Sequence, residues 1–130
     1  MKDLSDFDWS EYTILIADDD DGNFILLTFM LDDVKASVIR ASNGLEAVEA
    51  CKSNQKIDLV LMDVKMPVMD GIEATRTIKS FRPDLPIIMQ SAHIIEDVKL
   101  YCFDAGCDEF LVKPFIEDLF YQLIDSYLKK

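Results

Sequence analysis

Carboxylate side chains follow two apolar segments at the point where each segment ends. Residues 12–17 lead directly into Asp18 and Asp19, and residues 57–62 lead directly into Asp63. If these segments are buried strands, the acids lie at carboxyl ends of strands, where open α/β sheets bind their ligands. Clustered carboxylates repel one another and require a cation, and hard oxygen ligands beside a phosphate suit Mg²⁺. The spacing therefore indicates a magnesium site, with Asp63 as a candidate for chemistry.

Two further polar side chains end apolar runs and could join that site. Lys113 precedes Pro114, which restricts the lysine backbone to an extended or turn conformation. As a compact point charge, its ammonium could pair with Asp63 or with a phosphoryl group carried there. Ser91 closes the run over residues 86–91 and could offer a hydroxyl to the same group. Taken alone, the lysine could be ordinary surface, and a serine at the end of a strand is weak evidence for function.

Five short apolar runs alternate with five segments of helical period along the chain. The predicted strands are residues 12–17, 36–41, 59–63, 86–91 and 109–112. The predicted helices are residues 23–33, 44–53, 71–81, 95–105 and 115–128. Alternation of this kind predicts a parallel sheet that is covered by helices on both faces.

Right-handed crossovers leave few topologies, and five strands favour a flavodoxin-like doubly wound α/β fold with strand order 2-1-3-4-5. The carboxyl ends of the first, third, fourth and fifth strands would then surround one crevice. The side chains brought to this crevice are those of Asp18, Asp19, Asp63, Ser91 and Lys113. Acids after a strand can instead cap the next helix, and we expect that role for Asp20 and Asp21.

Length and composition describe one globular domain. Of 130 residues, 50% are hydrophobic, which is enough for a full core, and we place the domain at residues 12–130. Residues 1–11 are acidic and polar, and we interpret them as a tail or linker remnant. The net charge of -12 argues against nucleic-acid binding through phosphates by this domain.

The sequence also indicates the compartment. No apolar stretch approaches the ~20 residues of a membrane span, and the N-terminus lacks the apolar core of a signal peptide, so we expect no membrane contact by this domain. Cys51, Cys102 and Cys107 have no zinc-binding spacing. They are expected to be reduced thiols of a cytoplasmic protein.

Four segments together resemble the receiver domain of two-component response regulators (CheY-like). They are residues 14–19, residues 62–71 with the string M-D-V-K-M-P-V-M-D-G, residues 90–92 with Q-S-A, and residues 110–115 with F-L-V-K-P-F. The resemblance covers about residues 12–128. The string around Asp63 is highly specific, and with the acid pair and the K-P-F motif a chance match is very improbable.

The resemblance implies a phosphoryl-acceptor role for Asp63. A phosphohistidine on a histidine kinase or Hpt protein would donate the phosphoryl group. Asp18, Asp19, Asp63 and the backbone carbonyl of Lys65 would bind Mg²⁺. A carboxylate that forms an acyl phosphate is an established covalent nucleophile.

The resemblance also implies a switch. Lys113 would contact the phosphoryl group, Ser91 would move toward it, and Phe110 would turn inward. The responding face would combine the fourth helix, fifth strand and fifth helix. For Phe110 a plain half-buried strand aromatic is the alternative.

The sequence leaves the wider protein open. The acidic lead-in and Asn23 resemble receivers fused to the C-terminus of hybrid histidine kinases, in which the kinase core of the same polypeptide would donate the phosphoryl group. A stand-alone receiver is the alternative, and the oligomeric state is undetermined. By itself the domain is not expected to be a conventional enzyme, beyond self-phosphorylation and autodephosphorylation.

Two other functions compete with the receiver. A Mg²⁺-dependent phosphatase of the haloacid dehalogenase type also uses an aspartate nucleophile after a strand. It normally needs a second acid two residues later, where this chain has Lys65. A flavodoxin-like nucleotide binder would need a phosphate cradle after the first strand, where four aspartates would repel a phosphate.

Overall fold

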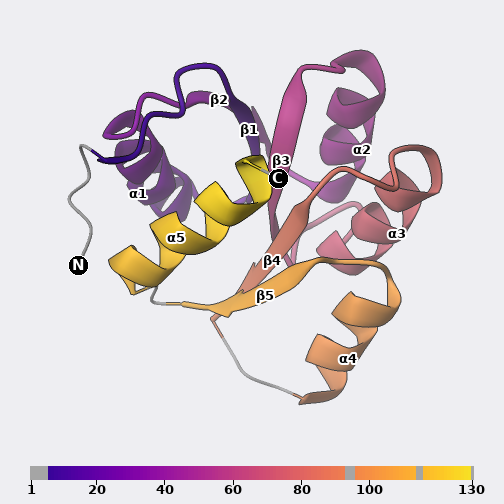
Figure 1. Ribbon diagram of the computed structural model, residues 1–130. Coiled ribbons are helices and arrows are strands. Elements are labelled where there is room, and N and C mark those ends of the chain that lie inside the picture. The colour runs from indigo at the N-terminus through magenta and orange to yellow at the C-terminus, as the bar shows by residue number, and fades with distance from the viewer. Residues whose placement is uncertain (1–5, 93–95, 114–115, 130) are drawn as a thin grey trace.

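The computed structural model describes residues 6–92, 96–113 and 116–129, in which strands and helices alternate (Figure 1). The strands are β1 (Thr13–Ala17), β2 (Ser37–Ala41), β3 (Ile57–Asp63), β4 (Ile87–Ser91) and β5 (Glu109–Val112). The helices are α1 (Asp21–Asp32), α2 (Gly44–Ser53), α3 (Gly71–Phe81), α4 (Glu96–Asp104) and α5 (Glu117–Leu128). The predicted βα alternation is confirmed.

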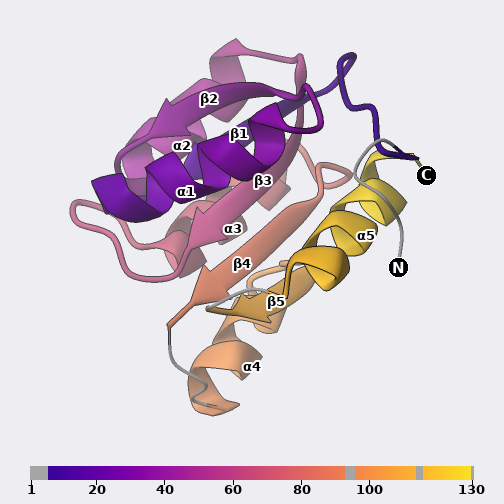
Figure 2. The ribbon, with the colours of Figure 1, turned by 90° about the vertical axis from the view of Figure 1, so that its left-hand side faces the viewer.

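The sheet has the order β2-β1-β3-β4-β5, and every pair of neighbouring strands is parallel. This confirms the flavodoxin-like order 2-1-3-4-5. Figure 2 shows the strands side by side in one twisted sheet, with α1 and α5 on the side toward the viewer. The order makes β3 the central strand, so the carboxyl end of β3 is flanked by those of β1 and β4.

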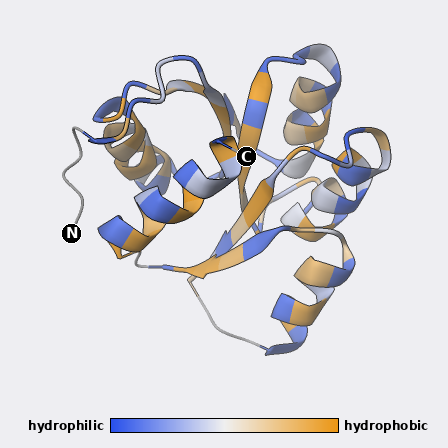
Figure 3. Cartoon of the chain, viewed as in Figure 1, coloured by the Kyte–Doolittle hydropathy of each residue, from blue (hydrophilic) through white to orange (hydrophobic). Residues whose placement is uncertain are grey.

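Two apolar layers hold the helices on the sheet. On one face, α1 and α5 pack on alternate strand residues, including Ile14, Leu61 and Ile88. On the other face, α2, α3 and α4 pack on the intervening residues, including Leu15 and Met62. Figure 3 shows the central strands as largely hydrophobic, whereas the helices carry polar residues as well. Burial on both faces explains why β1, β3 and β4 read as continuous apolar runs.

The first helix begins earlier than its apolar periodicity predicts. Asp20 is its N-cap, since the Asp20 Oδ1 accepts hydrogen bonds from the backbone N–H of Gly22 at 2.9 Å and of Asn23 at 3.2 Å. The expected cap is therefore confirmed for Asp20. Asp21 is not the cap: it is the first residue of α1, where the macrodipole favours its negative charge, and its carboxylate pairs with Arg40 at 2.7 Å. The predicted starts of the fourth and fifth helices, at residues 95 and 115, lie outside the described residues.

Two aromatic residues of the N-terminal segment are part of the core. Phe7 is 6% exposed and Trp9 is fully buried. The backbone N–H of Trp9 donates to the Val34 carbonyl at 2.8 Å, and its indole N–H donates to Asp125 of α5 at 2.9 Å. Phe7 and Trp9 therefore pack on the domain, which the polar composition of residues 1–11 did not indicate. That the segment is a linker remnant stays a prediction.

Two other findings concern the environment of the chain. Cys51, Cys102 and Cys107 are free and buried, and burial raises the pKa of the Cys51 thiol to about 11. Among the described helices, none has the length and apolarity that crossing a bilayer requires.

Candidate functional site

Three carboxylates meet at the carboxyl end of the central strands. Ala17 of β1 pairs in register with Met62 of β3. The next residues along the chain, Asp18 and Asp63, therefore lie side by side at the carboxyl ends of these two strands. One carboxylate oxygen each from Asp18, Asp19 and Asp63 lie within 4.8 Å of one another. Asp18 is buried, Asp63 is partly buried and Asp19 is exposed. This confirms that the first two acids point toward Asp63, and the set of hard oxygen donors fits Mg²⁺.

The Asp18 carboxylate is held from both sides by its own loop and helix. Its Oδ1 accepts the backbone N–H of Asp20 at 2.9 Å, and its Oδ2 accepts a hydrogen bond from the side-chain amide of Asn23. The guanidinium of Arg40 donates to the Asp18 carbonyl at 3.2 Å. Partners of this kind fix the orientation of a metal ligand. The contacts of Asn23 and Arg40 with Asp18 were not predicted from the sequence. The contact of Asn23 depends on the helix beginning at Asp21.

Lys113 lies beside Asp63, the pairing that the sequence suggested, and also beside Asp18. Its ammonium nitrogen is 3.6 Å from Asp18 Oδ2 and 3.5 Å from Asp63 Oδ1. Its backbone N–H donates to the Ser91 carbonyl at 2.8 Å, which extends the pairing of β4 and β5 past the end of the strands. One ammonium faces three carboxylates, so the site retains excess negative charge.

Burial and the neighbouring charges together change the pKa of the Asp63 carboxyl. Burial disfavours the charged form and raises the pKa of the Asp63 carboxyl to about 6. The Lys113 ammonium lowers that pKa, and repulsion from Asp18 raises it further. At neutral pH the carboxylate is ionised, and a divalent cation would relieve the repulsion that Lys113 leaves uncompensated.

The loop after Asp63 folds back tightly on the strand. The Gly71 N–H donates to the Val64 carbonyl at 2.8 Å, and a Cβ at Gly71 would lie 2.0 Å from the Asp63 carbonyl oxygen. Only glycine permits this approach. Val68, in the same loop, has a φ of 69°, a left-handed conformation that is costly for a β-branched residue. Strain of this kind is concentrated at functional sites.

The remaining predicted residues have less direct support. Ser91 ends β4 and is partly buried. Phe110 is partly buried and packs against the apolar layer of α2, α3 and α4. Lys65 is exposed two residues after Asp63, and the metal-binding role of its carbonyl stays a prediction. Pro114 and Phe115 of the K-P-F motif lie outside the described residues.

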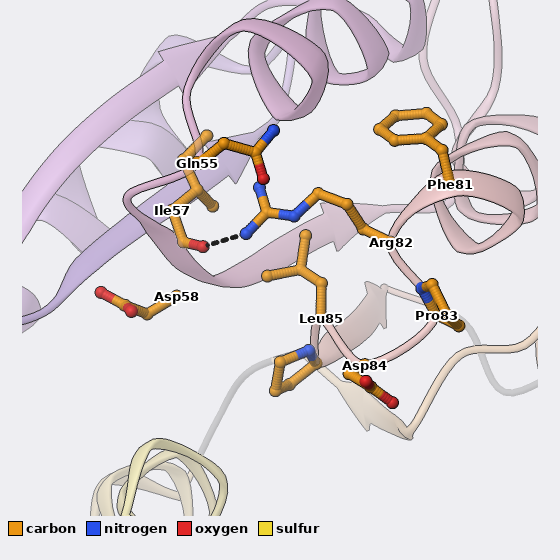
Figure 4. Close-up of a pocket in the computed structure, with 9 residues that line it drawn as sticks. Gln55, Ile57, Asp58, Phe81, Arg82, Pro83, Asp84 and Leu85 are labelled. Atoms are coloured by element: carbon orange, nitrogen blue, oxygen red, sulfur yellow. Dashed lines mark hydrogen bonds between the residues drawn. The ribbon is translucent and has the colours of Figure 1, made fainter.

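A separate pocket lies at the opposite end of the sheet, and Figure 4 shows its lining. Arg82 is part of this lining, and its guanidinium donates to the backbone carbonyl of Ile57 at 2.7 Å and to those of Asn54 and Cys51 at 3.2 and 3.3 Å. These bonds tie the end of α3 to the end of α2, the loop after it and the start of β3. The pocket is therefore a structural feature, far along the strands from Asp63.

Comparison with known proteins identifies the same domain. The family described as "Response regulator receiver domain" matches residues 14–125. The sensor protein GacS of Pseudomonas syringae pv. syringae is 35% identical over 116 residues, and the alignment covers 85% of this chain. The signal transduction histidine-protein kinase BarA of Escherichia coli is 33% identical over 117 residues, and the alignment covers 88% of this chain. The chain spans only 13% of the length of each.

A solved structure shares the fold of this chain. The receiver domain of the sensor histidine kinase PA1611 from Pseudomonas aeruginosa PAO1 has a TM-score of 0.85 and 27% identity, covers 92% of this chain and is itself covered to 98%. Its active-site cleft coordinates a magnesium ion. These comparisons give no support to a haloacid dehalogenase-type phosphatase. Family, fold and acidic cleft agree, and the chain belongs to the response regulator receiver domains of two-component signalling.

Proposed function

We propose that Asp63 is the phosphoacceptor of this receiver domain and takes its phosphoryl group from the phosphohistidine of a histidine kinase or Hpt protein. One observation carries the proposal. Asp63 lies at the carboxyl end of the central strand, within 4.8 Å of two further carboxylates and 3.5 Å from the Lys113 ammonium. A nucleophile, a cation-binding pair of acids and a fixed positive charge are the parts that phosphoryl transfer needs.

The residues present fit a magnesium ion. Asp18, Asp19 and Asp63 would hold it together with the backbone carbonyl of Lys65, and water would complete the shell. The metal, when bound, neutralises negative charge on the phosphoryl oxygens. Asp20 and Asn23 keep the Asp18 carboxylate oriented for this task, because both donate hydrogen bonds to it.

The transfer itself uses the Asp63 carboxylate. One of its oxygens attacks phosphorus, the bond from phosphorus to the donor histidine nitrogen breaks, and an acyl phosphate forms. Lys113 already lies beside Asp63 and attracts the phosphoryl oxygens as they arrive. Water later attacks phosphorus, the bond from phosphorus to Asp63 breaks, and inorganic phosphate leaves.

The signal would leave through the α4-β5-α5 face. Ser91 would move toward the phosphoryl group, and Phe110, which already packs partly against the core, would turn further inward. Exposed apolar side chains on α4, Leu100 and Tyr101, would give that face a surface whose position a partner can sense. Attachment of a new charge at Asp63 biases this two-state element.

The relatives suggest the larger protein. GacS and BarA are a sensor protein and a histidine kinase, and the chain covers a small share of each. We infer a cytoplasmic receiver segment of a hybrid histidine kinase, with the kinase core of the same polypeptide as donor. Neither nucleic acid nor membrane is a proposed partner of this domain, whose net charge is -12.

Incubation with acetyl phosphate and Mg²⁺, read by intact mass, tests the proposal. We expect one added phosphoryl group in the parent and none in Asp63→Ala. Asp84→Ala is the matched control, because Asp84 is an exposed acid at the opposite end of the sheet. If Asp63→Ala is modified as readily as the parent, Asp63 is not the phosphoacceptor.

A further inference from the structure

Gln90 is a buried polar residue that follows three apolar residues of β4 and precedes Ser91. Its neighbours in β4, Ile87, Ile88 and Met89, are fully buried, and Gln90 itself is 1% exposed. Neither its side-chain nitrogen nor its side-chain oxygen has a hydrogen-bond partner among the residues that the structure describes. Burial of an unpaired amide destabilises a fold, and methionine or leucine of similar size would avoid that cost. An unpaired buried group of this kind requires an explanation.

The position of Gln90 in the sheet places it beside the phosphoryl-transfer site. Gln90 is in register with Asp63 of β3 on one side and with Leu111 of β5 on the other. Residues paired in register on parallel strands project from the same face, which here is the face that α1 and α5 cover. Lys113 follows Leu111 by two residues, so it lies on the same face of the sheet as Gln90, on the adjacent strand and toward the carboxyl end.

The ammonium of Lys113 is loosely held in this arrangement. Its distances of 3.6 Å to Asp18 and 3.5 Å to Asp63 exceed those of a close charged hydrogen bond. A phosphoryl group on Asp63 introduces new oxygens that attract the ammonium and draw it away from its place between the carboxylates. The Lys113 ammonium can donate three hydrogen bonds. The side-chain oxygen of Gln90, on the adjacent strand, is an acceptor that has no partner among the described residues.

We propose that Gln90 is a positioning residue that orients the Lys113 ammonium in the phosphorylated state. This proposal rests on the proposed function of Asp63. The Gln90 side-chain oxygen accepts a hydrogen bond from the Lys113 ammonium once Asp63 carries a phosphoryl group. The bond keeps the ammonium on the phosphoryl oxygens. The unpaired amide of the resting domain is thus the cost of an interaction that forms only after phosphoryl transfer, so Gln90 favours the phosphorylated state.

Gln90→Met tests this, because methionine keeps the size and removes the polar atoms. The probe is beryllium fluoride with Mg²⁺, a stable mimic of a carboxylate-bound phosphoryl group. We expect the variant to unfold at the same or a higher temperature than the parent when no probe is bound. We also expect it to bind the probe about threefold to tenfold more weakly, which corresponds to one net hydrogen bond. Ile88→Leu, a volume-conserving change on the same face of β4, should leave the affinity unchanged.

A double-mutant cycle distinguishes positioning from packing. In Lys113→Met, the further change Gln90→Met should have no effect on probe affinity, because the hydrogen-bond donor is already gone. Equal affinity of Gln90→Met and the parent, or the same loss with and without Lys113, would overturn the inference. Gln90→Leu replaces the methionine variant if the latter does not fold.

The same experiment separates this inference from the proposed function. If the parent binds no beryllium fluoride, or if Asp63→Ala binds it as well as the parent, the phosphoacceptor assignment fails. If the parent binds and Asp63→Ala does not, while Gln90→Met equals the parent, only the role of Gln90 fails.

Discussion

The Asp63 carboxylate is destabilised in the folded domain. Its pKa is raised from 3.8 to about 6, chiefly because burial disfavours the charged form. Between pH ~4 and ~6 the folded state therefore binds more protons than the unfolded chain, and the contribution of Asp63 to the free energy of unfolding falls as the pH rises. Above pH ~6 the full destabilisation is present.

Replacement of Asp63 by asparagine should stabilise the metal-free domain. At pH 7.5 we expect Asp63→Asn to raise the free energy of unfolding by about 1–3 kcal/mol, because a shift of one pKa unit corresponds to about 1.4 kcal/mol. Near pH 3.5 the gain should largely vanish, since the carboxyl is then mostly protonated in the folded state. Urea denaturation followed by circular dichroism, in the presence of a chelator, measures both values.

The control for this change is an acid without such surroundings. Asp84→Asn removes an exposed carboxylate and should change stability by less than about 0.5 kcal/mol at either pH. A gain in Asp63→Asn that is the same at both pH values would show that the Asp63 charge is not the source of the destabilisation.

At the scale of elements, the site depends on how the loop between β3 and α3 returns to the strand. Gly71 begins α3, and Asp70 caps it by accepting the Glu73 N–H at 2.8 Å. The same turn brings the backbone of Gly71 against the carbonyl of Asp63. The helix start and Asp63, for which we propose the phosphoacceptor role, are therefore positioned by one backbone contact.

Gly71→Ala should disturb Asp63 without touching its side chain. The new Cβ would lie 2.0 Å from the Asp63 carbonyl oxygen, so backbone must move. We expect a loss of about 1–3 kcal/mol in the free energy of unfolding and a slower reaction with acetyl phosphate. Gly22→Ala is the matched control, because its Cβ would meet only the Asp20 side chain, at 3.3 Å. Equal phosphorylation rates in the two variants would contradict the positional role of Gly71.

The elements also show what sequence could and could not predict. The alternation of apolar runs and helical segments is local, so strands and helices were placed to within a few residues. The packing of Trp9 on Val34 and Asp125 is not local: it joins residues 116 positions apart, and no periodicity marks it. Gln90 was missed for a related reason, since only the neighbouring strands determine whether its amide finds a partner.

For the whole molecule, topology explains why the site was predictable. Asp18, Asp63 and Lys113 are distant in sequence, but right-handed crossovers in a parallel sheet bring their strand ends to one edge. The supporting contacts of Asn23 and Arg40 depend on side-chain directions that topology does not determine.

The net charge of -12 gives the whole domain two responses to cations. Any salt screens the self-repulsion of the folded state, whereas Mg²⁺ should also bind the three-carboxylate site. We expect millimolar Mg²⁺ to raise the melting temperature above that in NaCl of equal ionic strength. Asp19→Asn should remove the excess and leave the NaCl response intact. If the variant keeps the full excess, Mg²⁺ stabilises the domain elsewhere.

The buried position of Trp9 has a practical consequence. It is the sole tryptophan of the chain, it is fully shielded from solvent, and its indole is hydrogen-bonded to α5. The wavelength and intensity of tryptophan emission depend on such shielding and bonding. The domain therefore contains an intrinsic optical probe of how α5 packs against the N-terminal segment. If phosphorylation of Asp63 shifts α5, as we propose for the α4-β5-α5 face, tryptophan fluorescence should report the shift without an attached dye.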